Sequence, residues 1–292
     1  MHSDSNMPES ATSRTIRSLR AEVRGRLAAC SDTPGLDADL LIGQVLDMDR
    51  PALLIHDERA VSDEEERAIH ELALRRMAGE PVAYIVGRKS FRGVDLIVDP
   101  QVLVPRPETE EMVDFAHRWL REHSPPARIL DLGTGSGAIA LALASELGVR
   151  AGVEIVGSDV SDGALDVARR NRAALGLENQ VELYRSDLFT DLDGAFDVVL
   201  ANLPYLRNDQ CHPSTRMEPD LALYAGEDGL ALYRRLLDEL NSRVTGRGMA
   251  VLEIDPDQRV TLIDIMAGIE GWTARIEADL AGLDRYLVLH RR

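Results

Sequence analysis

The sequence predicts an α/β protein in which a Rossmann-like, doubly wound domain of seven strands follows a small all-helical domain and a β-hairpin linker. Three observations predict this fold. Apolar residues recur at helical spacing between about Thr15 and Gly79. From Arg128 onward, short apolar runs alternate with amphipathic stretches. The first of those runs ends in a glycine-rich turn, from Gly133 to Gly137.

The helical domain is expected over residues 13–81. Between Ile16 and Leu27 the apolar residues follow one another every three or four positions, as on one face of a helix. Ser62 and the acidic residues after it predict an N-cap and the first turn of another helix. The sequence of this domain shows no ionisable constellation. We therefore expect it to dock a substrate, with a purely structural cap as the alternative.

A β-hairpin linker is expected at residues 82–106, because glycines separate β-prone runs at 84–87 and 94–104. Pro107 follows and can occupy the first turn of the next helix. The remaining residues, 107–292, are predicted to form the doubly wound domain. Its strands are expected at residues 128–132, 153–158, 181–184, 196–201, 249–254, 272–276 and 285–290, and its helices at 138–147, 163–175, 229–244 and 258–266.

Composition limits the classes of partner and location. The chain has 292 residues, 45% of them hydrophobic, and a formal net charge of −17. An acidic chain is poorly suited to phosphate backbones, so we expect no direct nucleic-acid partner. No apolar run approaches the roughly 18 residues of a membrane span, and the polar residues 1–12 are predicted to be a disordered tail. With two distant cysteines and no histidine pair at ligand spacing, we expect a cytoplasmic, monomeric protein without membrane contact or metal.

The glycine-rich turn predicts a nucleotide-like cofactor. Glycines allow the backbone to turn tightly and to approach a ligand closely at the N-terminus of the next helix. Asp159, at the end of the second predicted strand, can accept hydrogen bonds from both hydroxyls of a ribose. Asp187 follows the third strand, where such folds hold an adenine ring, and Leu188 and Phe189 can pack on the face of that ring.

Two cofactor classes fit the glycines, since Gly133, Gly135 and Ala138 also satisfy the dinucleotide fingerprint. Three features favour S-adenosylmethionine over a nicotinamide. The turn continues as Gly-x-Gly-x-Gly, Asp131 can receive a cationic amino group, and the fourth strand ends in a segment that hydride transfer does not need. The predicted cofactor-binding residues are Asp131, Gly133, Thr134, Gly135, Ser136, Gly137, Asp159, Asp187, Leu188 and Asn202.

That segment, Asn202-Leu203-Pro204-Tyr205, predicts methyl transfer to a planar nitrogen, and its four residues are the predicted catalytic residues. An amide nitrogen is a poor nucleophile because its lone pair is delocalised. The Asn202 side-chain oxygen and the Leu203 carbonyl can accept its two N–H bonds, orient it and meet the positive charge that develops as it attacks. Pro204 stiffens the loop, and Tyr205 offers a flat face. The alternative is a plain turn after a strand.

At these residues the chain resembles the bacterial HemK-type protein-glutamine methyltransferases, which methylate the glutamine of the Gly-Gly-Gln loop in peptide chain release factors. The resemblance covers nearly the whole chain. Its most specific motif is Pro105-Arg106-Pro107-Glu108-Thr109-Glu110, and further motifs lie at 78–87, 131–137, 218–230 and 279–285. It implies a helical domain that helps to grip the release factor, a hairpin linker, and a seven-stranded domain of the class I methyltransferases that use S-adenosylmethionine.

Carried over by position, the resemblance implies that Arg106, Glu108, Asn202 and Tyr205 contact the substrate. The chain departs from the family pattern at Leu203, where proline is usual, and after Glu253, where a glycine is usual. An N-methyltransferase paralogue acting on a small-molecule amide, guanidine or amine is the main alternative. A nucleic-acid adenine methyltransferase and a scaffold without catalysis are further ones.

Overall fold

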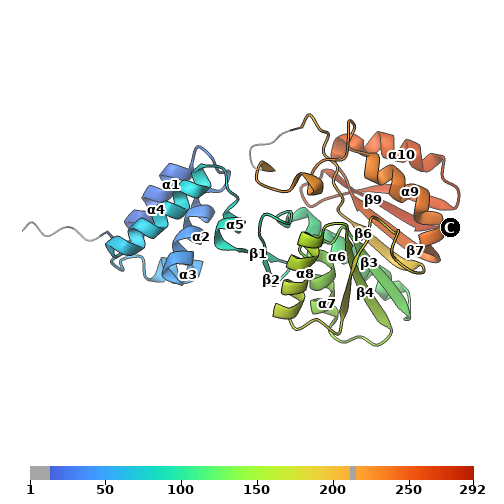
Figure 1. The fold of residues 1–292 in the computed structure, drawn as a ribbon, viewed down its shortest axis with the longest axis horizontal. Helices are drawn as coiled ribbons and strands as arrows, with labels where there is room; N and C mark the ends of the chain where they lie inside the picture. Colours follow the sequence, from blue (N-terminus) through green and yellow to red (C-terminus); the bar gives the residue numbers. More distant parts are fainter. Residues whose placement is uncertain (1–13, 211–214) are drawn as a thin grey trace, which may run out of the picture. The chain divides into compact units, whose positions relative to one another are not determined.

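The computed structural model describes residues 14–210 and 215–292 (Figure 1). The predicted tail at 1–12 and Cys211, one of the two cysteines, lie outside the described residues. The chain divides into two compact units, Met1–Val86 and Gly87–Arg292. In the described ranges, no helix is both long enough and apolar enough to cross a membrane.

Helices form the first unit, as predicted. Ser62 caps α4 by accepting a hydrogen bond from the Glu65 N–H, while the Glu65 side chain accepts one from the Ser62 N–H. This capping box is the one that the sequence predicts. Twelve buried apolar residues, from Ile16 to Ile85, form a separate core. The helices are α1 (Ile16–Leu27), α2 (Pro34–Leu46), α3 (Arg50–Ile55), α4 (Asp63–Met77) and α5 (Val82–Val86).

Two buried carboxylates on α2 pair with arginines from other segments of the first unit, and sequence reasoning missed them. Asp39 accepts two hydrogen bonds from Arg20, at 2.7 and 3.1 Å, and one from Arg50 at 3.2 Å. Asp37 accepts one from Arg76 on α4 at 2.7 Å. Both aspartates are nearly inaccessible to solvent. Their arginines are far away in sequence, so only folding reveals the pairs.

Replacing Arg76 with methionine should lower the free energy of unfolding by about 3 kcal/mol, because the buried Asp37 carboxylate loses its cationic partner. The matched control is Arg26→Met, which breaks an exposed pair with Glu22 and should cost less than about 1 kcal/mol. Urea denaturation followed by circular dichroism measures both. Equal losses would contradict the assigned role of the buried pair.

The linker differs from its prediction at both ends, since residues 82–86 are helical and no strand extends over 98–106. Residues 82–86 form the short helix α5, because the Tyr84 and Ile85 N–H groups both donate to the Pro81 carbonyl. The hairpin is confined to β1 (Arg88–Phe91) and β2 (Val94–Ile97), which pair antiparallel. Its turn places Arg92 and Gly93 at positive φ.

Seven strands of the second unit form one sheet in the order β5-β4-β3-β6-β7-β9-β8. Strands β3 to β7 are mutually parallel, and β9 runs antiparallel to both of its neighbours. β7 begins before the predicted position 249, because Val244 already pairs with Phe196 ahead of a bulge. The strands are β3 (Ala127–Leu132), β4 (Val153–Asp159), β5 (Val181–Arg185), β6 (Phe196–Ala201), β7 (Val244–Glu253), β8 (Trp272–Ala278) and β9 (Asp284–Arg291).

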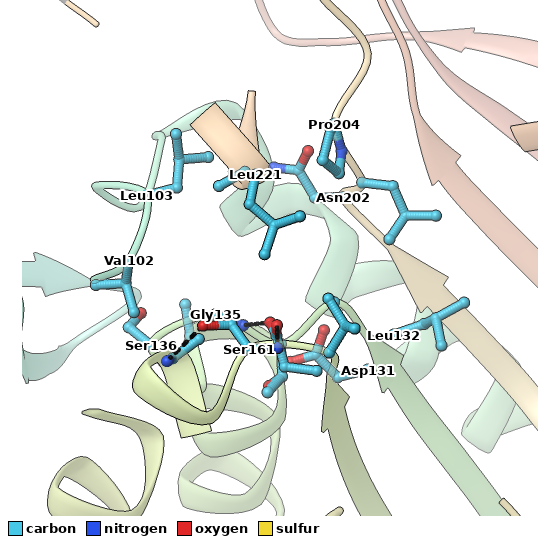
Figure 2. A pocket seen from close by; sticks show the side chains of 18 of the residues that line it. Val102, Leu103, Asp131, Leu132, Gly135, Ser136, Ser161, Asn202, Pro204 and Leu221 are labelled. Carbon is cyan, nitrogen blue, oxygen red and sulfur yellow. Dashed lines mark hydrogen bonds between the residues drawn. The ribbon is translucent and has the colours of Figure 1, made fainter. Parts of the chain in front are cut away.

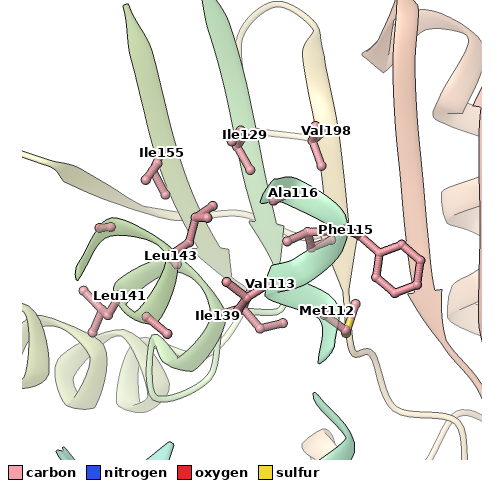
Figure 3. Close-up of a cluster of buried hydrophobic side chains, with 14 of the residues drawn as sticks. Met112, Val113, Phe115, Ala116, Ile129, Ile139, Leu141, Leu143, Ile155 and Val198 are labelled. Atoms are coloured by element: carbon pink, nitrogen blue, oxygen red, sulfur yellow. The ribbon is translucent and has the colours of Figure 1, made fainter. Parts of the chain in front are cut away.

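Helices cover both faces of this sheet, which confirms the predicted doubly wound α/β fold. Figure 3 shows α6 and α7 packed on one face, against Ile129, Ile155 and Val198. Residues that alternate with these, such as Leu130 and Val199, pack on the other face with α9 and α10. The helices are α6 (Glu111–Glu122), α7 (Ala138–Leu147), α8 (Asp162–Ala174), α9 (Ala231–Arg243) and α10 (Arg259–Ala267), with the short 3-10 helices η1 (Glu108–Glu110), η3 (Asp220–Ala222) and η4 (Pro256–Gln258).

Candidate active site

A cavity of about 330 Å³ lies at the carboxyl ends of the parallel strands. The chain runs from β3 outward to β4 and β5, and then returns to place β6 on the other side of β3. Such a reversal leaves a crevice where ligands bind in doubly wound folds. The loops after β3, β4, β5 and β6 all contribute to the lining of this cavity. The topology therefore brings together most of the residues that the sequence singles out.

The glycine-rich turn lines the cavity through residues 133–136. Gly133 and Gly135 have positive φ values of 75° and 56°, a backbone conformation that favours glycine. The N–H groups of Gly133 and Thr134 both donate to the Ser158 carbonyl at 2.8 Å, which ties the turn to β4. Gly137 is not part of the lining. It precedes α7 at φ 84°, and a Cβ there would lie 2.7 Å from Leu141.

Asp131 is the buried acid of the cavity, with 2% of its surface exposed. Its Oδ2 accepts hydrogen bonds from the Thr134 hydroxyl at 2.6 Å and from the Ala140 N–H at 3.0 Å. Its Oδ1 has no hydrogen-bond partner in the described part of the chain. Burial raises the pKa of Asp131 to about 6, although its two donors lower it. Near neutral pH the site therefore holds a carboxylate with one free oxygen.

Asp159 lies at the end of β4 and also lines the cavity. Its oxygens accept the N–H groups of Gly135 and Ser161, both at 2.9 Å. Burial raises its pKa, and these backbone bonds oppose the shift. Each carboxylate oxygen can accept a second hydrogen bond. Asp159 can therefore hold the glycine turn and still accept hydrogen bonds from a ligand.

The loop after β5 supplies the far end of the cavity. Leu188 is buried there and has a φ of 52°, which is unusual for a non-glycine residue. Asp187 lines the cavity with a half-exposed side chain that pairs with Arg235 at 2.9 Å. Phe189, expected to share the ring face with Leu188, is instead fully buried in the core beneath α9 and does not line the cavity.

The loop after β6 faces the glycine turn. Asn202, Leu203 and Pro204 line the cavity, and Figure 2 shows Asn202 and Pro204 across the cavity from Gly135 and Asp131. The Asn202 Nδ2 atom donates to the Thr109 hydroxyl at 2.9 Å. In the described residues, no protein donor reaches the Asn202 Oδ1 atom. That oxygen is free to accept a hydrogen bond from a ligand.

Comparisons with known proteins decide the family. A family model described as the PrmC N-terminal domain matches residues 18–87, and one described as a methyltransferase domain matches residues 123–240. The release factor glutamine methyltransferase of Deinococcus radiodurans is 35% identical over 280 residues, which cover 94% of this chain and 98% of that protein. The protein of the same name from Agrobacterium fabrum is 37% identical, over 94% of this chain and 96% of its own. The chain belongs to the release factor glutamine methyltransferases.

Solved structures support the fold of this methyltransferase. The catalytic domain of hMettl16, in complex with a 3′UTR hairpin, aligns with a TM-score of 0.54. The alignment covers 80% of this chain and 84% of that chain, at 16% sequence identity. At this identity the likeness concerns the fold alone.

Leu203, one of the two departures from the family pattern, packs against the glycine-rich turn. Its side chain is 5% exposed, and a Cβ added to Gly133 would lie 2.8 Å from Leu203 Cδ2. The Leu203 carbonyl lies 3.4 Å from the Tyr233 hydroxyl, whose nearer acceptor is the Glu253 carbonyl. The side chain therefore holds the loop by apolar contact, in place of the backbone restriction of a proline.

Of the residues expected to contact substrate, Arg106 lines the cavity and Glu108 does not. Arg106 pairs at 2.6 Å with Glu218, whose pKa burial raises to about 7 against the lowering effect of the arginine. Successive residues of a 3-10 turn point about 120° apart, and it is Thr109 of η1 that lines the cavity. The Glu108 carbonyl accepts a hydrogen bond from Tyr286 at 2.6 Å.

Tyr205 also lies outside the cavity lining, because its ring packs against the core under α9 and α10. Burial raises the pKa of its hydroxyl. Sequence reasoning missed several lining residues, and for most of them no local signal exists. They are Gln101, Val102, Leu103, Thr109, Ser161, Leu221, Leu232 and Arg235. Within the described ranges, no cluster of three or more histidine, cysteine or acidic residues is placed to hold a metal ion.

Proposed function

We propose that this methyltransferase moves a methyl group from S-adenosylmethionine to the side-chain amide nitrogen of a glutamine in a peptide chain release factor, within its Gly-Gly-Gln loop. The family membership supports the reaction and the acceptor protein. The cavity supports the donor and the mode of catalysis. Because release factors act in translation, we place the reaction in the cytoplasm.

The residues on one side of the cavity fit the donor. The amino acid part of S-adenosylmethionine carries an ammonium group. The buried Asp131 offers this group a carboxylate oxygen that has no hydrogen-bond partner in the described residues. Asp159 would accept the ribose hydroxyls, and Leu188 would pack against the adenine. When bound, S-adenosylmethionine supplies an electrophilic methyl group on a sulfonium.

The residues on the opposite side fit the acceptor. A primary amide has two N–H bonds, and the Asn202 Oδ1 atom and the Leu203 carbonyl are two acceptors on one loop. When both bonds are held, the amide nitrogen is oriented and its growing positive charge meets dipoles already in place. No strong general base is required, because the methylated nitrogen loses its proton readily.

One observation carries this proposal: Asp131, with its unpartnered oxygen, and Asn202, with its free Oδ1, line the same cavity from the ends of adjacent strands. This arrangement supports a site for the cationic donor next to a site for the amide nitrogen. Methyl transfer by in-line displacement requires this juxtaposition.

A transfer assay with methyl-labelled S-adenosylmethionine tests the proposal. Purified release factor and a release factor whose Gly-Gly-Gln glutamine is replaced by alanine are offered in parallel, beside an extract of small metabolites. Label on the first protein and not on the second is the expected result. Label that appears only in the metabolite fraction would overturn the acceptor and favour a small-molecule N-methyltransferase.

A further inference from the structure

Thr109, Glu253 and Asn202 form one chain of hydrogen bonds beside the cavity. Asn202 directly follows β6, and Glu253 is the last residue of β7, its parallel neighbour. Thr109 belongs to η1, far from both in sequence. The Asn202 Nδ2 atom lies 2.9 Å from Thr109 Oγ1, and that oxygen lies 2.7 Å from Glu253 Oε2.

We propose that Thr109 and Glu253 are positioning residues which determine that the oxygen, and not the nitrogen, of the Asn202 amide faces the acceptor nitrogen. This role rests on the proposed function, since it orients the group that receives the substrate amide. Neither residue needs to touch the substrate. Both act through Asn202.

When Glu253 is ionised, only one arrangement of the hydrogen bonds between Glu253, Thr109 and Asn202 is possible. A carboxylate only accepts hydrogen bonds, so the single Thr109 hydroxyl proton must point to Glu253. The Thr109 oxygen can then only accept from Asn202, which must present its NH₂ group to it. The Asn202 Oδ1 atom is thereby turned away from Thr109 and toward the cavity. The ionised carboxylate by itself decides this direction.

A neutral Glu253 would remove this constraint. A protonated carboxyl group can donate to the Thr109 oxygen, and the Thr109 hydroxyl is then free to donate to Asn202 Oδ1. The amide could rotate by half a turn and present its NH₂ group to the acceptor nitrogen. Two donors would then face one another, and the acceptor nitrogen would lose its orientation. Turnover should therefore require the ionised form of Glu253.

The surroundings of Glu253 make this proton sensitive to pH near neutrality. The residue is 1% exposed, and burial raises its pKa to about 7. The Thr109 hydroxyl, the Arg285 charge and the Tyr205 hydroxyl lower this pKa, whereas the Glu108 charge raises it. Among the described residues, Tyr233 from α9 and Tyr286 from β9 also interact with it, and burial raises the pKa of both hydroxyls.

Three variants test the positioning role: Thr109→Val, Thr109→Ser and Glu253→Gln. Thr109→Val keeps the shape and removes the hydroxyl, and we expect kcat to fall about tenfold to a hundredfold. Thr109→Ser restores the hydroxyl and should restore kcat to within about threefold. Affinity for S-adenosylmethionine, measured by calorimetry, should stay within a few-fold in all three, because the residues proposed to hold the donor are Asp131, Asp159 and Leu188.

The pH dependence of kcat distinguishes a positioning role of Glu253 from a purely structural one. In the wild type, kcat at saturating donor should rise as pH increases through about 7, the pKa of Glu253. A glutamine side chain cannot ionise, so kcat of Glu253→Gln should show no rise near pH 7. A wild-type profile that is flat from pH 6 to 8, or an unchanged rise in Glu253→Gln, would overturn the proposal.

A readout without any acceptor distinguishes this proposal from the proposed function. The side-chain NH₂ signals of Asn202, identified in a ¹⁵N spectrum by their loss in Asn202→Ala, should shift with a midpoint near pH 7 in the free enzyme. The same signals should be insensitive to pH in Glu253→Gln. If they titrate as expected while release factor takes no label, the positioning holds and the acceptor is wrong. If they do not titrate, the positioning fails whatever the acceptor is.

Discussion

Asn202→Ala should reduce turnover by about a hundredfold to a thousandfold, the usual effect of removing one oriented dipole from a catalytic site. The Asn202 Oδ1 atom is the side-chain acceptor that the described residues leave free on the acceptor side of the cavity. Without it, the glutamine amide would keep only the Leu203 carbonyl and would lose its orientation. The variant should still bind S-adenosylmethionine within a few-fold, since the glycine turn and the strand-end aspartates are untouched.

Single-turnover kinetics with labelled donor and calorimetric donor binding measure the two effects separately. Asn208→Ala is the matched control, because Asn208 lies in the same loop with an exposed side chain and outside the cavity lining. It should keep near-normal turnover. Retained turnover in Asn202→Ala would show that the mechanism proposed for this loop is wrong. A loss of donor binding equal to the loss of turnover would show that Asn202 serves the donor instead.

Asp131→Asn should weaken the binding of S-adenosylmethionine by about tenfold to a hundredfold, because a hydrogen bond to a charged group contributes about 1.5–3 kcal/mol. The asparagine oxygen can replace Asp131 Oδ2 and accept from Thr134 and Ala140. Its NH₂ group would then point where the free oxygen had been. An NH₂ group cannot accept a hydrogen bond from the ammonium of the donor. Charge and direction are both lost, while the shape is kept.

The donor affinity of the wild type should also fall as pH decreases through about 6, the raised pKa of Asp131, because protonation neutralises the carboxylate. Asp131→Asn should lack this dependence. Calorimetry from pH 5 to 8 measures it. The control is Asp187→Asn, whose half-exposed side chain already pairs with Arg235 and should change affinity only a few-fold. A larger loss in Asp187→Asn than in Asp131→Asn would show that the ammonium group of the donor binds near Asp187 and not near Asp131.

Together these measurements divide the cavity into two halves. Substitution or protonation of Asp131 should weaken the affinity for the donor. Substitution of Asn202 should instead lower turnover at saturating donor. The part of the kcat rise near pH 7 that Glu253→Gln removes belongs to Glu253, and it should be absent from the donor affinity. Asp131 and Glu253 are therefore distinguishable although their pKa values are close.

The sequence alone determined the fold class and the two ends of the cavity. Buried parallel strands must be apolar runs, and a backbone that turns beside a ligand needs glycine, so Phe196–Ala201 and the turn at Gly133 are visible without a structure. Asp131, Asp159 and Asn202 could be found for a related reason. Each lies at or next to the end of a predicted strand, and parallel strands bring those ends to one edge of the sheet.

Only the tertiary structure decided which neighbours complete the site. Thr109 reaches Asn202 from η1, and Leu203 packs directly against Gly133. Both contacts depend on packing between segments distant in sequence. The direction of a side chain is likewise a tertiary property. Glu108 precedes Thr109 in the same motif, yet the turn of η1 places only Thr109 in the cavity lining. Periodicity predicts strands, helices and their ends. The partner of a buried polar group is set by where distant backbone segments meet, and no local pattern encodes it.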